Sequence, residues 1–168
     1  MKQVRQSAFE TNSSSSHSIT IAAGDFTPDT LYLENGVLEI YPGEYGWEHE
    51  DYYDAATKAS YCLTWLKMCE GRGSAVEDEQ MFIKVLKEVT GATEVKFVPA
   101  FTEETKTDSD FWNWGYIDHQ SGPGEGGTLN AAWASEDALK SFIFNSRSRL
   151  HTDNDNDPCS ECESRYDY

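Results

Sequence analysis

The sequence predicts an α+β fold in a single domain, and three observations support this class. Alternating apolar and polar residues indicate strands within residues 4–41, and further strands near residues 95 and 115. Apolar residues spaced three and four apart indicate two helices between these regions and a third helix after them. A chain of 168 residues, 38% of them hydrophobic, can bury one substantial core. We therefore expect a mainly antiparallel sheet covered by two or three helices, with the domain spanning residues 1–150.

The clearest strand signal is a hairpin over residues 31–41. Asn35-Gly36 separates two alternating apolar runs, and a two-residue hairpin turn of this kind requires positive φ at both positions. Further strands are predicted at residues 4–9, 18–22, 94–100 and 111–119.

Each predicted helix has a recognisable start. Asp54 can cap the first helix, residues 74–77 form a capping box for the second, and Ser135 can cap the third. Gly71 and Gly91 are suitable stop residues for the first two. The apolar positions of all three helices follow one face, which predicts that this face packs against the sheet.

The charge of the chain restricts its partners and its compartment. Thirty acidic residues against thirteen basic ones give a net charge of −17, which argues against direct binding to nucleic acid or to an anionic membrane surface. The same charge favours a basic protein partner attracted by electrostatic steering. Because the sequence has no signal-peptide pattern and no apolar run of membrane-spanning length, we expect a cytoplasmic protein with reduced cysteines.

A serine-rich run ending in a histidine is the most unusual stretch near the N-terminus. Consecutive hydroxyl groups and backbone N–H groups in a tight loop can bind an anion, and His17 adds a proton donor, a general base or a metal ligand. A structural turn and a flexible linker are the alternatives for this run. The anion-binding candidates in the run are Ser13, Ser14, Ser15 and Ser16.

Three phrases carry a resemblance to a set of small phage and bacterial proteins. FETNSSSSHS at residues 9–18 resembles the phrase found near the N-terminus of that set, and GYIDHQS at residues 115–121 resembles a second phrase. FIFN at residues 142–145, followed by TDNDN at residues 152–156, is similar to a third. The resemblance implies a phage or bacterial origin, hence the host cytoplasm for a phage protein, and a candidate site. It implies no particular reaction.

The polar residues of these phrases are the candidates for a catalytic or anion-binding site. His17, His119 and Asp118 are the candidate catalytic residues, although neighbours on a strand point to opposite faces, so the last two are not expected to pair with each other. Arg5 and Arg147 can recognise a phosphate or a carboxylate, with a surface salt bridge as the alternative. The glycine-rich residues 121–127 lack the Gly-Lys-Ser/Thr ending of a phosphate loop.

The C-terminal residues 151–168 are acidic and are expected to form a tail that contains a weak metal signal. Residues 153–157 alternate Asp and Asn as in a calcium loop, but Pro158 and Ser164 occupy the positions that require Gly and Glu, which excludes that loop.

A looser divalent-metal site in the tail would use His151, Asp153 and Asp155. Cys159 and Cys162 have the spacing of a zinc pair and could join His151. A solvated acidic turn is the alternative.

Two functions are compatible with these features. The first is a polar Ser/His/Asp site that binds an anionic small molecule or a divalent metal. The second is a non-enzymatic acidic protein that binds and inhibits a basic host protein, for example one that itself binds nucleic acid. Convergence of the candidate residues in space favours the first, and their dispersal favours the second.

Overall fold

The computed structural model describes residues 2–4, 17–46, 49–69, 75–100, 113–118 and 128–153. These residues form strands and helices in a mixed order along the chain. The elements are β1 (Lys2–Val4), β2 (Ser18–Ile21), β3 (Val37–Ile40), β4 (Glu44–Tyr45), β5 (Glu50–Tyr52), α1 (Ala55–Met68), α2 (Ala75–Thr90), β6 (Glu94–Phe97), β7 (Tyr116–Ile117), α3 (Glu136–Phe144) and β8 (Arg149–Thr152).

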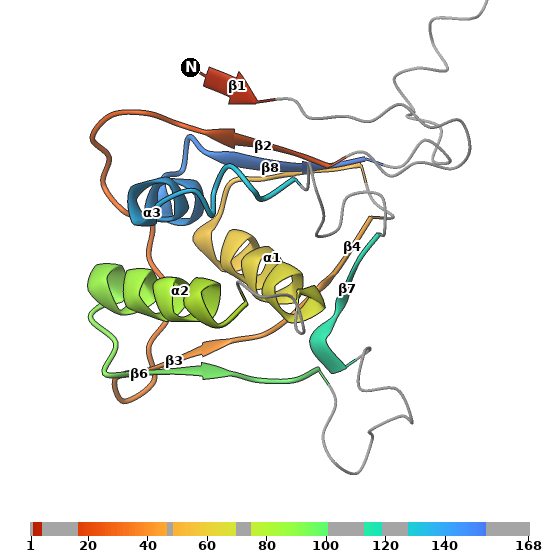
Figure 1. Ribbon diagram of the computed structural model, residues 1–168. Coiled ribbons are helices and arrows are strands. Elements are labelled where there is room, and N and C mark those ends of the chain that lie inside the picture. Colours follow the sequence, from red (N-terminus) through yellow and green to blue (C-terminus); the bar gives the residue numbers. More distant parts are fainter. Residues whose placement is uncertain are drawn as a thin grey trace, which may run out of the picture.

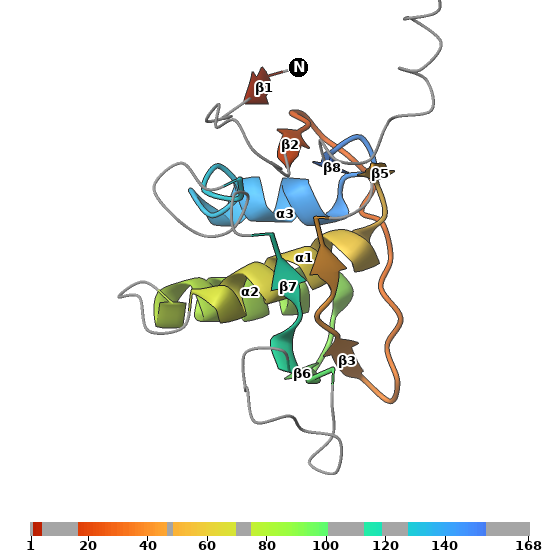
Figure 2. The same ribbon diagram turned by 90° about the vertical axis from the view of Figure 1, so that its right-hand side faces the viewer.

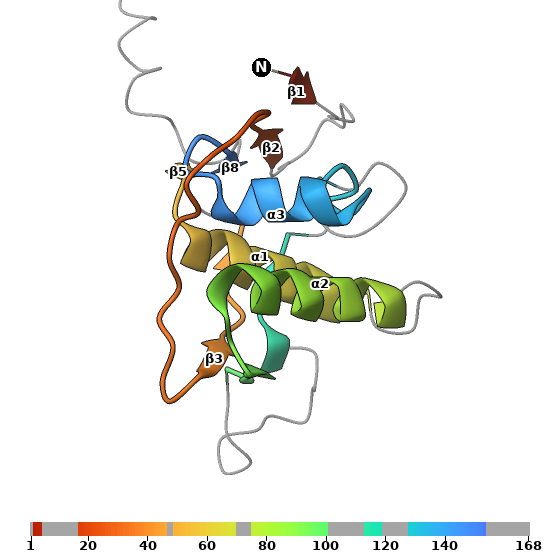
Figure 3. The same cartoon turned by 90° about the vertical axis from the view of Figure 1, so that its left-hand side faces the viewer.

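The helices form a layer between two sheets (Figure 1). On one side lies an antiparallel sheet in the order β1-β2-β8-β5, and on the other side β3 pairs with β6. The short strands β4 and β7 form a further pair that runs alongside α1 (Figure 2). Seen from the opposite side, α3 lies next to the antiparallel sheet and α2 lies next to β6 (Figure 3). None of the helices in the described part of the chain is long and apolar enough to cross a membrane.

Helix α1 occupies the centre of this arrangement, which explains why it is buried on nearly every side. The predicted cap is confirmed, because Asp54 accepts a hydrogen bond of 2.7 Å from the Thr57 N–H. Tyr61 and Leu63 are fully buried, and so is the thiol of Cys62, whose pKa is raised by that burial. Cys62 and Cys69 are free thiols, as their separation along one helix predicted.

A lysine lies inside this core and closes the end of another helix. Lys58 is fully buried, and its ammonium group donates to the carbonyl oxygens of Asn145 at 2.9 Å and Ser148 at 3.2 Å. Burial lowers the pKa of Lys58 to about 8. Cations are favourable at helix C-termini, so Lys58 fixes the turn between α3 and β8.

The other predicted starts and stops agree with the structure where it describes them. Ser135 caps α3 by accepting from the Ala138 N–H at 3.1 Å, and Gly91 directly follows α2. Ser74 and Gly71 lie outside the described residues. The predicted apolar faces are buried, with Phe82 and Leu86 of α2 fully enclosed.

The predicted hairpin is only partly correct. Asn35 and Gly36 have φ angles of 51° and 82°, and Glu34 and Val37 exchange two backbone hydrogen bonds of 2.9 Å, so the turn is present. Residues 31–33, however, form no strand, and β3 pairs in parallel with β6 instead.

The α+β class is confirmed, and the sheet that contains β2, β8 and β5 is antiparallel as expected. The expected single sheet is wrong, because β3 with β6 and β4 with β7 form separate parallel pairs. Helices α1 and α2 lie between β3 and β6 in the sequence. They belong to the crossover connection that a parallel pair of strands requires, and β6 runs parallel to β3.

The last described strand, β8, extends two residues past residue 150, where the domain was expected to end. His151 and Thr152, which were expected to begin the acidic tail, belong to β8, and this strand lies between β2 and β5. Leu150 and Thr152 are fully buried beneath the sheet. Of the predicted strand at residues 111–119, the structure describes residues 113–118, and within these the strand is limited to β7. Of the predicted strand at residues 4–9, only Val4 lies among the described residues, where it ends β1.

Candidate metal centre

Two copies of a His-x-Asp sequence meet on the outer face of the antiparallel sheet. His49-Glu50-Asp51 leads into β5, and His151-Thr152-Asp153 ends β8. Alternation along a strand places the His and the Asp of each copy on the same face. The antiparallel register pairs Asp51 with His151 and Glu50 with Thr152, which brings His49 opposite Asp153. Each histidine therefore faces the aspartate of the other copy.

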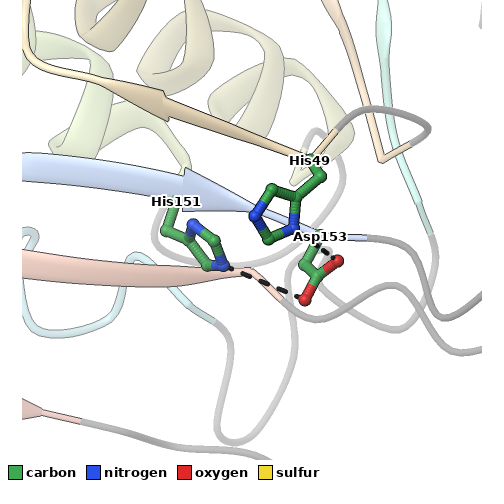
Figure 4. Close-up of side chains that lie close together, drawn as sticks. All are labelled: His49, His151 and Asp153. Carbon is green, nitrogen blue, oxygen red and sulfur yellow. Dashed lines mark hydrogen bonds and ion pairs between the residues drawn. The ribbon is translucent and has the colours of Figure 1, made fainter. Parts of the chain in front are cut away.

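The side chains make the contacts that this register predicts, and Figure 4 shows the contact between His49 and Asp153 together with His151. His49 Nδ1 lies 3.0 Å from Asp153 Oδ1, and His151 Nδ1 lies 2.8 Å from Asp51 Oδ1. The two imidazole rings are perpendicular, with their centroids 5.2 Å apart. His151 Nε2 lies 4.0 Å from Asp153 Oδ2, so these two pairs form one continuous cluster.

The contact with Asp51 determines which nitrogen of His151 is available to bind a metal ion. An ionised carboxylate only accepts hydrogen bonds, so in the neutral imidazole of His151 the proton is on Nδ1, which donates to Asp51, and the lone pair is on Nε2. Arg149 holds Asp51 in place from the other side, through a contact of 3.1 Å between NH1 and Oδ2. A carboxylate behind a histidine is the usual arrangement for orienting an imidazole toward a metal ion.

One ligand atom from each of His49, His151 and Asp153 lies within 4.8 Å of the other two. Two donors bound to one tetrahedral zinc ion are about 3.4 Å apart, so small side-chain rotations bring these atoms to coordination distance. The side chains of His49, His151 and Asp153 are 49%, 23% and 34% exposed, so an ion can reach them from solvent. The residues thus fit a metal ion both in donor type and in access.

His17, predicted as a proton donor, general base or metal ligand, is buried close enough to His151 and Asp153 to be influenced by their charges. It is 4% exposed, and its Nδ1 lies 2.8 Å from the hydroxyl oxygen of Tyr61 on α1. The pKa of His17 is lowered to about 4, chiefly by burial and also by the proximity of His151, while the carboxylates of Asp118 and Asp153 oppose the shift. His17 is therefore neutral at pH 7 and forms part of the core contact between β2 and α1.

Of the remaining predicted site residues, the structure describes Asp118 and Arg147, and the others lie outside the described residues. Asp118 is buried next to β7, where it accepts a hydrogen bond of 3.1 Å from the Tyr116 hydroxyl, and it lies close enough to His17 to affect its pKa. Arg147 is at the far end of β8 from Asp153, and its guanidinium donates to the backbone carbonyls of Ala23 and Asp25. The predictions that lie outside the described residues are those for Arg5, Ser13, Ser14, Ser15, Ser16, His119, Asp155, Cys159 and Cys162.

Sequence reasoning found half of the cluster. His151 and Asp153 were predicted as metal ligands, but His49 and Asp51 were not among the predicted site residues. The repeated His-x-Asp spacing was the available signal, because two of the four histidines are followed by an aspartate two residues later. The signal becomes specific only once both copies are known to lie on neighbouring antiparallel strands.

Comparison of the chain with protein-family models, with curated proteins and with solved structures found no match. The function is therefore argued from the geometry of the site alone.

Proposed function

We propose that this protein binds a divalent transition-metal ion, with zinc as the first candidate, through His49, His151 and Asp153. The observation that supports this most strongly is the reciprocal His-x-Asp pairing, in which Asp51 leaves Nε2 of His151 directed toward the cluster. The expected use of His151 and Asp153 as ligands is retained here, with His49 as the third ligand in place of Asp155.

The donor set selects among metals. Two imidazole nitrogens and one carboxylate oxygen suit Zn²⁺, Fe²⁺, Co²⁺ or Ni²⁺, whereas Ca²⁺ and Mg²⁺ prefer oxygen ligands throughout. Structural zinc sites are closed by four protein ligands, while three protein ligands leave a position for water or for an exogenous ligand. A metal ion bound at this partly exposed cluster would be able to coordinate an oxygen atom of an anionic small molecule. One site would then bind both of the ligand types predicted from the sequence, a divalent metal and an anionic small molecule.

Isothermal titration with ZnCl₂ tests this function. The native protein is expected to bind about one equivalent, and His49→Ala, His151→Ala and Asp153→Asn are each expected to weaken binding strongly. Asp51→Asn removes only the support of His151, so its expected loss is about 10- to 100-fold in affinity. Glu50→Gln is the matched control, because Glu50 is a carboxylate in the same strand that alternation points to the other face.

Two outcomes would contradict the assignment. The first is an absence of saturable binding by the native protein. The second is an affinity that is unchanged in the His49 and Asp153 variants but lost when Cys159 and Cys162 are replaced by serine. That second result would place the ion on the cysteine pair at the C-terminus instead.

A further inference from the structure

A groove lies along β3, and none of the candidate metal ligands is among the residues that line it. Its volume is about 590 Å³. Residues 31–34 form one wall, the first turns of α1 form another, and β3 itself runs along the groove. The side chains that line it and matter most here are Leu31, Tyr32, Glu34, Val37, Glu39 and Tyr41.

The strand edge that faces this groove has free backbone groups. The carbonyls of Gly36 and Ile40 accept from Thr93 and Val98, so the even-numbered positions of β3 point toward β6. Glu39 consequently points its backbone N–H and C=O to the opposite edge. Among the described residues, the only backbone bonds at that edge are those between Val37 and Glu34 at the turn.

An exposed strand edge is a template for a further strand. Extended peptides bind such edges through main-chain hydrogen bonds, and pockets beside the edge accept alternate side chains. Two large aromatic side chains extend from the groove into solvent, because Tyr32 is 84% exposed and Tyr41 is 53% exposed. Exposed tyrosines are enriched at protein interfaces, where they give large contact area at small conformational cost.

The charge of the groove indicates what kind of segment it accepts. Glu34 and Glu39 are exposed carboxylates, and no Lys, Arg or His is among the described residues that line the groove. Lys96 is the nearest base by register, since it lies beside Glu39 on β6, outside the lining. A second copy of this chain is disfavoured as the occupant, because each copy carries a net charge of −17.

We propose that this groove binds an extended basic segment of another protein, which adds a strand to the free edge of β3. Lysine or arginine side chains of that segment would lie over Glu34 and Glu39, and its apolar side chains would enter the groove beside Leu31 and Val37. This surface gives the expected basic protein partner a specific docking place, and it is independent of metal binding.

The probe is a capped heptapeptide in which lysine alternates with valine, titrated into the full-length protein. Saturable binding is expected at or below about 1 mM, and it is expected to weaken as NaCl rises from about 0.05 to about 0.5 M. The Glu34→Lys/Glu39→Lys double variant is expected to lose about tenfold or more in affinity. The control double variant Asp25→Lys/Glu77→Lys makes the same change in net charge at exposed positions that do not line the groove.

Two further measurements separate strand addition from loose charge attraction. A peptide with proline in place of the central valine is expected to bind much more weakly, because proline cannot donate to the ladder. Bound peptide is also expected to slow hydrogen exchange of the Glu39 N–H in the native protein. Equal losses in both double variants, equal binding of the proline peptide, or no binding up to about 1 mM would each overturn the proposed docking site.

Discussion

The stability of this protein is expected to fall in acid because of His17. The imidazole is buried and has a pKa of about 4, against an ordinary value of 6.5 in an unfolded chain. Below pH 6.5 the unfolded state therefore takes up a proton that the native state resists, and the unfolding free energy decreases as the pH falls. The contribution of His17 is complete above pH 6.5 and is lost progressively as the pH falls to about 4.

The size of this effect follows from the two pKa values. The gap between 6.5 and about 4 corresponds to about 3 kcal/mol, at about 1.4 kcal/mol for each pKa unit. Carboxylates also titrate over this range, so the effect of His17 has to be isolated by comparison with a variant. His17→Gln retains a polar side chain next to the Tyr61 hydroxyl but does not titrate.

The assay is urea denaturation of the native protein and His17→Gln at several pH values from about 8 to about 4, a range that extends from above the pKa of histidine in the unfolded chain down to the pKa of native His17. At pH 8 the variant is expected to be less stable by about 1 kcal/mol, because the native contact with Tyr61 is altered. The difference is expected to shrink and then reverse as the pH falls. Parallel pH profiles for the two proteins would refute the reasoning, since they would mean that His17 does not resist protonation.

Three other predictions follow from the fold. Gly36→Val is expected to lower the melting temperature clearly, because φ is 82° at this position and a β-branched residue there is strained; an unchanged melting temperature would contradict the turn. Lys58→Met is expected to cost about 2 kcal/mol in urea denaturation at pH 7, because two backbone carbonyls after α3 lose a charged donor; equal or higher stability would contradict this. Ending the chain after Asp153 is expected to change stability by less than about 0.5 kcal/mol and to leave zinc affinity intact, since β8 and all three proposed ligands remain. Lost zinc binding in titration would show that residues 154–168 contribute to the site.

Local signals in the sequence predicted the elements better than their pairing. The caps at Asp54 and Ser135, the turn at Asn35-Gly36 and the apolar helix faces all depend on residues within a few positions of one another, and the structure agrees with them. Strand pairing depends on distant segments. The direction of β6 relative to β3 is determined by how the two intervening helices cross the molecule, and alternation in residues 94–97 contains no information on that.

In the candidate site, too, local sequence signals were recognised and contacts between distant segments were not. His151 and Asp153 were found because they lie in an unusual acidic stretch, but the last two residues of β8, His151 and Thr152, were assigned to the tail. A strand of four residues gives too short a pattern of alternation to be recognised. The contribution of His49 depends on the register between two strands about one hundred residues apart, as the Asp51–His151 contact shows. The burial of His17 likewise results from packing against α1, and a serine-rich neighbourhood in the sequence cannot reveal it.

The measurement that tests the central claim most directly is NMR of the imidazole ring nitrogens during a titration with Zn²⁺. The chain has four histidines, so each ring can be followed and assigned with single variants. At one equivalent of zinc, the account predicts large shifts for His49 and His151, with Nε2 of His151 as the nitrogen that binds, and no metal-bound signal for the buried His17. Binding through Nδ1 of His151, or unchanged signals for His49 and His151 at saturating zinc, would contradict it.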